Sequence, residues 1–80
     1  MLTELKTGPR VVGAKQARRA LNDGRALRVF LAEDADPGIT EPIAALCAEK
    51  GVCVERAANM RELGQACGIA VGAAVAVLVR

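Results

Sequence analysis

Three cationic side chains fall together on one flank of a short helix that begins after a glycine. Wound at about 100° per residue, residues 14–22 bring Lys15, Arg18 and Arg19 onto one side, with Gln16 at the edge. Gly13 allows a sharp turn into this helix, so its first turn is exposed. The free backbone N–H groups of a helix start and the helix dipole both favour an anion. The stretch therefore predicts a contact site for a polyanion.

Other chemistries fit the sequence less well. Residues 8–15 come close to a phosphate-binding P-loop, but the lysine is one residue late and no Ser or Thr follows it. Asp34 and Asp36 could hold a divalent metal, although such acidic residues more often close a turn after a strand. A cysteine nucleophile needs a base beside it, and the chain has no histidine. We therefore expect a non-catalytic protein with no metal and no cofactor.

The composition indicates one small globular domain spanning residues 1–80. Hydrophobic residues make up 52 % of the chain, and Phe30 is the only aromatic residue. The core must therefore be built from small and branched aliphatic side chains. Residues 1–28 carry seven basic and two acidic residues, whereas residues 29–55 carry one basic and six acidic residues. This asymmetry suggests a basic surface for a polyanion beside a surface that repels it, although ordinary solvated charge is the simpler alternative.

The cysteines and the apolar segments place the chain in a reducing, aqueous compartment. Cys47, Cys53 and Cys67 are odd in number and contain no CxxC pair, so we expect three buried, reduced thiols. The N-terminus is polar and shows no signal peptide. The longest apolar run, residues 66–79, is shorter than the roughly 20 residues that cross a bilayer. We expect a cytoplasmic protein without a membrane segment.

Predicted strands and helices alternate along the chain. We expect one or two helical turns within residues 1–7, with Leu2 and Leu5 facing inward, and a helix over residues 14–22 with Gly24 as its C-cap. Two further helices should cover residues 40–50, capped by Thr40, and residues 60–66, capped by Asn59. Strands are predicted over residues 10–12, 25–32, 52–54 and 73–79. The alternation predicts an α/β fold, a three-layer α/β/α sandwich with a mixed four-stranded sheet.

Glycines at a spacing of four residues surround the last predicted loop. Gly64, Gly68 and Gly72 have the spacing seen in paired membrane helices, but this segment is too short and Gly68 interrupts it. Close approach of backbone in a loop over residues 68–72 is the better interpretation. The sequence leaves open whether Ile69 and Val71 in this loop are exposed to a partner or pack inward.

A nucleic acid is the polyanion that best fits the cationic helix, and the composition limits how it could be bound. A chain with one aromatic residue cannot stack bases on a platform of rings. Recognition must use phosphate contacts, polar contacts to base edges, and shape. A bent RNA suits this requirement, because a bend opens the major groove that regular A-form RNA keeps too narrow for a helix.

Three blocks of residues resemble the L7Ae/L30e ribosomal protein family, and most closely its small bacterial members. The blocks are residues 13–19 (GAKQARR), 31–37 (LAEDADP) and 63–74 (LGQACGIAVGAA). They occur in the order and spacing of the family, and the likeness covers nearly the whole chain. The third block is the most specific of the three.

The resemblance implies a protein that binds kink-turns, which are sharply bent RNA elements built on tandem sheared G·A pairs. In the family, the start of a helix enters the major groove at those pairs, which corresponds here to Gly13, Lys15, Gln16 and Arg19. The loop before the last strand packs on extruded or stem nucleotides, which corresponds to Ile69, Ala70 and Val71.

The resemblance also assigns supporting residues. An acidic residue that orients the helix start corresponds to Asp36, and Arg61 could replace a basic residue that some members have at the position of Met60. Archaeal and eukaryotic members carry Asn-Glu where this chain has Lys15-Gln16, and lysine where it has Arg19. Lys and Arg remain suitable donors for the O6 and N7 atoms of guanine. Arg18, Arg10 and Arg28 are candidates for phosphate contacts.

The sequence and the resemblance together indicate a monomeric protein that recognises kink-turns in ribosomal or riboswitch RNA and associates with the ribosome. Two alternatives stay open. One is a protein–protein adaptor that uses the apolar loop or an exposed strand edge. The other is a small metal- or thiol-dependent enzyme centred on Asp34, Asp36 and a cysteine.

Overall fold

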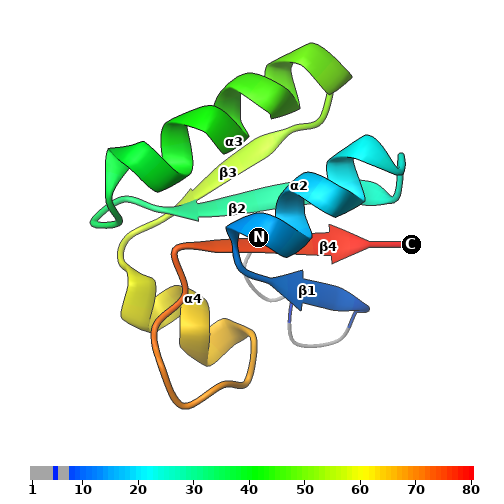
Figure 1. Ribbon diagram of the computed structural model, residues 1–80. Coiled ribbons are helices and arrows are strands. Elements are labelled where there is room, and N and C mark those ends of the chain that lie inside the picture. The colour runs from blue at the N-terminus through cyan, green and yellow to red at the C-terminus, as the bar shows by residue number, and fades with distance from the viewer. Residues whose placement is uncertain (1–4, 6–7) are drawn as a thin grey trace.

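The computed structural model describes residue 5 and residues 8–80, and it shows three helices and a four-stranded sheet in this part of the chain. Figure 1 shows their arrangement. The elements in chain order are β1 (Arg10–Val12), α2 (Ala14–Asn22), β2 (Ala26–Ala32), α3 (Pro37–Lys50), β3 (Val54–Ala57), α4 (Met60–Ala66) and β4 (Val75–Val79). The helix expected within residues 1–7 lies outside the described residues except for Leu5, which is helical and fully buried.

The sheet is mixed, with the strand order β1-β4-β2-β3. β4 runs antiparallel to both of its neighbours, β1 and β2, whereas β2 and β3 are parallel. β4 is the last strand of the chain, and it lies between the first two strands (Figure 1). In every strand pair of the described sheet, at least one helix lies between the two strands in the sequence.

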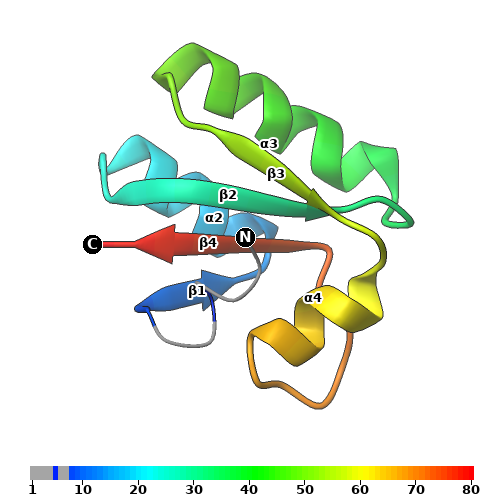
Figure 2. The same ribbon diagram turned by 180° about the vertical axis from the view of Figure 1, so that it is seen from behind.

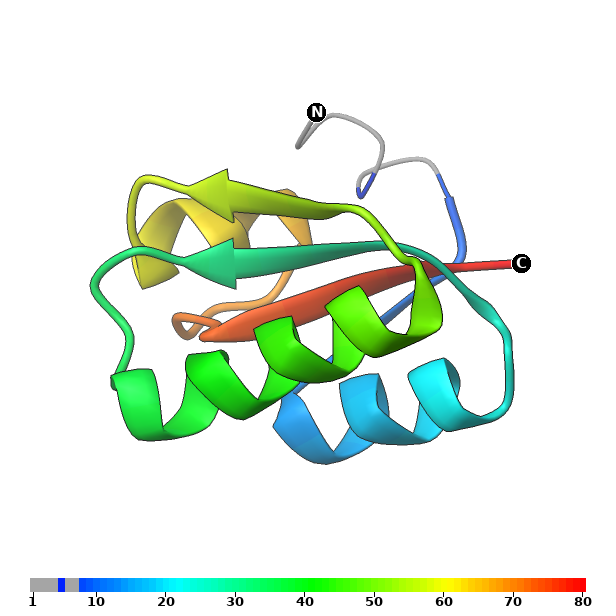
Figure 3. The same ribbon diagram turned by 90° about the horizontal axis from the view of Figure 1, so that it is seen from above.

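Two apolar clusters lie on opposite faces of the sheet, which confirms the three-layer arrangement. Val29 and Leu31 point toward α2 and α3, whereas Phe30 and Ala32 point toward α4, as the alternation of side chains along a strand requires. Figure 3 shows α2 and α3 side by side beneath the sheet. Phe30 is fully buried in the cluster that contains Leu5 and Leu63. Both layers of the core consist mainly of Ala, Val, Leu and Ile, as the composition predicts.

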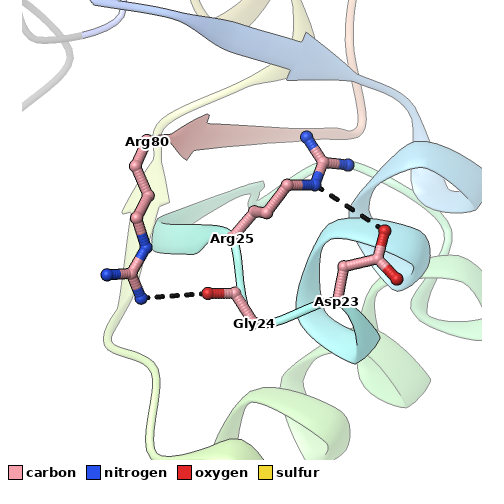
Figure 4. Close-up of polar contacts among 4 residues, drawn as sticks. All are labelled: Asp23, Gly24, Arg25 and Arg80. Atoms are coloured by element: carbon pink, nitrogen blue, oxygen red, sulfur yellow. Dashed lines mark hydrogen bonds and ion pairs between the residues drawn. The ribbon is translucent and has the colours of Figure 1, made fainter.

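Backbone and side-chain contacts surround the end of α2, at the end of the sheet where β2 begins and β4 finishes. Gly24 follows the C-cap residue Asp23 and has a φ of 73°, a conformation that glycine adopts without strain. The N–H of Arg25 donates to the carbonyl of Ala20 at 3.0 Å. Figure 4 shows Arg80 donating from Nη2 to the carbonyl of Gly24 at 3.0 Å, and an ion pair of 3.7 Å between Arg25 and Asp23. The N–H groups of residues 23–25 thereby satisfy three of the last carbonyls of the helix, those of Arg19, Ala20 and Leu21.

The N-cap of α3 lies four residues earlier than the sequence predicted. α3 begins at Pro37, and its cap is Asp36, whose side chain accepts a hydrogen bond of 2.9 Å from the N–H of Gly38. Thr40 is buried inside the helix and is not its cap. Proline at the first helical position has a suitable φ and lacks only an N–H that would be unpaired there. The prediction failed because Pro42 was placed in the first turn, whereas the helix continues through it.

The third strand was also misplaced. β3 covers Val54–Ala57 rather than residues 52–54, because Gly51 ends α3 with a φ of 70° and the N–H of Val52 still donates to the carbonyl of Cys47. Cys53 lies in the connection and is exposed, so the expectation that all three thiols are buried was wrong. β4 starts at Val75, two residues later than predicted, because the N–H of Ala73 donates to Met60 of α4.

No helix in the described part of the chain is both long enough and apolar enough to span a bilayer.

The three thiols should differ in reactivity. Burial raises the pKa of the Cys47 thiol, and it also raises the pKa of Cys67 although Arg10 partly offsets the effect. Both groups therefore stay protonated and covered at neutral pH, whereas Cys53 is exposed. Iodoacetamide should label one cysteine in the native protein and three in urea, as measured by intact mass and peptide mapping. Labelling of Cys47 at the rate of Cys53 in the native protein would contradict the structure.

The cap of α3 gives a second measurable expectation. Asp36→Ala removes the acceptor for the N–H of Gly38 and should lower the free energy of unfolding by about 1 kcal/mol, within the usual range of about 0.5–2 kcal/mol. Asp36→Asn keeps an acceptor oxygen and should stay close to wild type. Urea titration followed by circular dichroism measures both. If Asp36→Ala unfolds at the wild-type midpoint, Asp36 does not cap the helix.

Candidate nucleic-acid interface

Four connections of the chain meet at one end of the sheet. The carboxyl ends of β1 and β2 lie on either side of the start of β4 because β4 runs antiparallel to both strands. The carboxyl end of β3 lies at the same end of the sheet because β3 is parallel to β2. The N–H of Gly13 donates to Val75 at 2.9 Å, and the N–H of Ala32 donates to Ala74 at 2.9 Å. The start of α2, the turn over residues 33–36, the start of α4 and the loop over residues 68–72 are thereby gathered at this end (Figure 2).

The start of α2 is an open, cationic helix terminus. Gly13 occupies the N-cap position with a φ of 105°, and it has no side chain with which to cap the helix. The first turn contains no acidic residue, and the first helical hydrogen bond is donated by Ala17 to Gly13. The N–H groups of residues 14–16 are therefore oriented outward without a helical partner. Such a terminus attracts anionic or electron-rich atoms.

The polar residues predicted on α2 are exposed. Four side chains lie on its outer surface, and they are Lys15, Gln16, Arg18 and Arg19. Ala17, Ala20 and Leu21 are buried against the sheet and α3. Within the part of the chain that the structure describes, none of the three cations forms an ion pair. Their charges therefore remain available to a ligand.

The loop over residues 68–72 presents apolar side chains to solvent. Ile69 is 36 % exposed and Val71 is 70 % exposed, and Ala70 between them is also exposed. The question that the sequence left open is thereby answered, because neither large side chain packs inward. Exposed apolar groups that are this close together are typical of a binding surface.

Two glycines allow the apolar loop, residues 68–72, to lie close to α4. A Cβ atom on Gly64 would overlap the carbonyl of Val71, and a Cβ on Gly72 would lie 3.1 Å from the Cβ of Met60. The N–H of Ile69 donates to the carbonyl of Gly64 at 3.1 Å. The glycine spacing noted in the sequence therefore serves close backbone approach within one molecule, as predicted.

Asp34 connects the acidic turn to α4, a contact that sequence reasoning missed. Its Oδ1 accepts a hydrogen bond of 2.8 Å from the N–H of Met60, the first residue of the helix. Asp34, Arg61, Gln65 and the loop over residues 69–72 line an open pocket of about 380 Å³. The acidic residues after β2 gave only a turn signal in the sequence, and nothing local indicated a partner 26 residues away.

The remaining predicted residues differ in what they contact. Asp36 uses its carboxylate to cap α3, and Arg61 is exposed at the rim of the pocket. Arg10 donates a hydrogen bond to the carbonyl of Cys67, and Arg28 forms an ion pair of 3.7 Å with Glu55. Two of the three arginines considered for phosphate contacts, Arg10 and Arg28, are thus engaged within the protein. No group of three or more potential metal ligands occurs among the described residues.

Comparison with known proteins identifies the family. The model of the "Ribosomal protein L7Ae/L30e/S12e/Gadd45 family" matches residues 2–80. An RNA-binding protein of Geobacillus sp. (strain WCH70) is 46 % identical over 76 residues, which cover 95 % of this chain and 93 % of that protein. The RNA-binding protein YbxF of Geobacillus stearothermophilus is 45 % identical with the same coverage.

The fold is similar to that of a protein whose structure has been solved. The 15.5kD RNA binding protein of Giardia lamblia superposes with a TM-score of 0.93 at 32 % sequence identity, over 99 % of this chain and 70 % of that protein. These relatives are named for binding, and none of the names describes catalysis. From the match over residues 2–80 and the shared α/β fold, the chain belongs to the Ribosomal protein L7Ae/L30e/S12e/Gadd45 family.

Proposed function

We propose that this protein binds RNA and recognises kink-turns with the end of the sheet where α2 begins. One observation carries the proposal: the uncapped, cationic start of α2 and the exposed apolar loop are brought to the same end of the sheet by the hydrogen bond between Gly13 and Val75. The names of the relatives support RNA as the ligand. A surface that is charged on one side and apolar on the other suits an RNA that exposes both phosphates and bases.

The start of α2 supplies the groups that read base edges. Lys15 and Arg19 are donors that suit the O6 and N7 atoms of guanine in tandem G·A pairs, and the Gln16 amide can both donate and accept. Gly13 has no side chain, so the RNA can approach the N–H groups of the first turn closely. A sharp bend in the RNA is needed because the major groove of a straight A-form helix excludes a protein helix.

The apolar loop supplies a surface for bases that the bend unstacks. Ile69, Ala70 and Val71 are exposed on a loop whose backbone lies close to Gly64 of α4, so that bases can pack on them. Arg61 at the rim of the neighbouring pocket and Arg18 on the flank of α2 are in exposed positions suited to phosphate contacts. Asp36 contributes indirectly, by fixing the turn that precedes α3 beside the same end of the sheet.

The RNA that this protein binds in the cell should contain a kink-turn. Kink-turns in ribosomal RNA or in a riboswitch present tandem G·A pairs and a bent backbone, and a monomer with one such surface binds one element at a time. The ribosomal name of the family favours association with the ribosome.

The first test compares a kink-turn RNA with a straight duplex of the same length and composition. The protein should bind the kink-turn more tightly, and the logarithm of its binding constant should fall with the logarithm of the salt concentration by about 0.7–0.9 per phosphate neutralised. Fluorescence anisotropy over a salt series measures both quantities. Equal affinity for the two RNAs would contradict kink-turn recognition, and no binding to either RNA would favour a protein–protein adaptor.

The second test separates base reading from phosphate contact. Lys15→Ala should weaken kink-turn binding by about 1–3 kcal/mol and reduce discrimination against an RNA with disrupted G·A pairs. Arg18→Ala should weaken binding to both RNAs by similar factors and lower the salt slope by about 1.

Lys50→Ala is the matched control for both variants. Lys50 is an exposed lysine at the far end of α3, so the variant removes the same charge from the opposite end of the molecule. Its affinity for both RNAs should stay at the wild-type value. If Lys15→Ala discriminates between the two RNAs as well as wild type does, Lys15 does not read the G·A pairs.

A further inference from the structure

Arg10 connects two segments of the proposed surface that are remote in the sequence. Its Nε donates a hydrogen bond of 2.9 Å to the carbonyl of Cys67, 57 residues away. Arg10 belongs to β1, which leads directly into Gly13 and the start of α2. Cys67 is the C-cap of α4, and the apolar loop begins immediately after it. One side chain therefore joins the strand that precedes the cationic helix to the start of the apolar loop.

The contact is made at a point where the loop depends on its backbone geometry. Gly68 has a φ of 76°, and a Cβ atom on it would lie 3.4 Å from Nη2 of Arg10. The N–H groups of Gly68 and Ile69 donate to the carbonyls of Gln65 and Gly64. The last carbonyls of a helix lack helical partners, and a cation is favoured at that end by the dipole. Arg10 thus satisfies a carbonyl at the position where the chain turns from α4 into the loop.

We propose that Arg10 is a positioning residue for RNA specificity, which fixes the apolar loop relative to the start of α2, and that it does not contact phosphate. The proposal rests on the proposed function, because it assigns Arg10 to the preference for bent RNA over straight RNA. A straight duplex can meet the cations of α2 alone, whereas a kink-turn must meet both segments at a fixed separation. Loss of the contact therefore weakens kink-turn binding selectively.

Two neutral replacements separate the hydrogen bond from the charge. Arg10→Gln places an amide nitrogen the same number of bonds from Cα as the Nε of arginine, so it keeps a donor for the Cys67 carbonyl without the charge. Arg10→Met keeps an unbranched apolar side chain and has no donor. The two variants have equal net charge, so any difference between them reflects the hydrogen bond.

The expected result is a difference between the variants in kink-turn affinity alone. Arg10→Met should weaken kink-turn binding on the order of tenfold, the size expected for one charge-assisted hydrogen bond, while binding to the straight duplex changes less than about twofold. Arg10→Gln should recover most of the kink-turn affinity. Both variants should keep the salt slope of wild type, because a lost phosphate contact would lower it by about 0.7–0.9.

A measurement without RNA tests the same contact in the free protein. In Arg10→Met, the amide protons of Gly68 and Ile69 should exchange with solvent faster than in Arg10→Gln, while those of α2 exchange at unchanged rates. If wild type itself shows no kink-turn preference, the proposed function fails. If wild type shows the preference and Arg10→Met retains it, or if both variants lose salt slope equally, the assignment of Arg10 as a positioning residue fails.

Discussion

The position of β4 between β1 and β2 is the constraint on which the rest of the structure depends. Since β4 is antiparallel to both neighbours, it begins beside the last residues of β1 and β2. The hydrogen bonds from Gly13 to Val75 and from Ala32 to Ala74 are the direct result. The pairing of the strands therefore brings together four connections, which carry charged, apolar and hydrogen-bonding groups. The two hydrogen bonds named here are formed by the backbone and need no contact between side chains.

A core of small aliphatic side chains lets the elements of this short chain pack closely. Ala17 and Ala20 let α2 lie close to the sheet, and Gly64 lets the apolar loop lie close to α4. This close packing positions the backbone from which the outward-facing residues of α2 and of the loop project. Such an arrangement suits the proposed binding surface.

Much of the fold could be predicted from the sequence because its signals are local. Helical periodicity placed α2 at residues 14–22, the capping residue Asn59 placed α4 at residues 60–66, and both ranges are confirmed. The errors arose where two local signals competed. Thr40 is a good N-cap residue, but Asp36 followed by Pro37 is a better helix start. The strand expected at residues 52–54 begins only at Val54, because the turn at the end of α3 extends beyond Gly51.

The exposed segments of the candidate site could be predicted from the sequence, but the hydrogen bonds that join them could not. The exposure of Lys15 and Arg19 follows from helical periodicity, and the loop over residues 68–72 follows from its glycines. The bonds from Arg10 to Cys67 and from Met60 to Asp34 join residues whose proximity is created by the sheet. No pattern within a short window of sequence contains that information.

The order in which the strands are made has a consequence for the protein in the cell. The first and second strands are not neighbours in the sheet, because β4 lies between them, and β4 is made after both. A nascent chain still lacking residues 75–79 has neither a complete sheet nor a fixed end to which α2 and the apolar loop can be attached. We therefore expect folding to be delayed until translation of β4 is complete, so that an unfinished chain cannot occupy an RNA target.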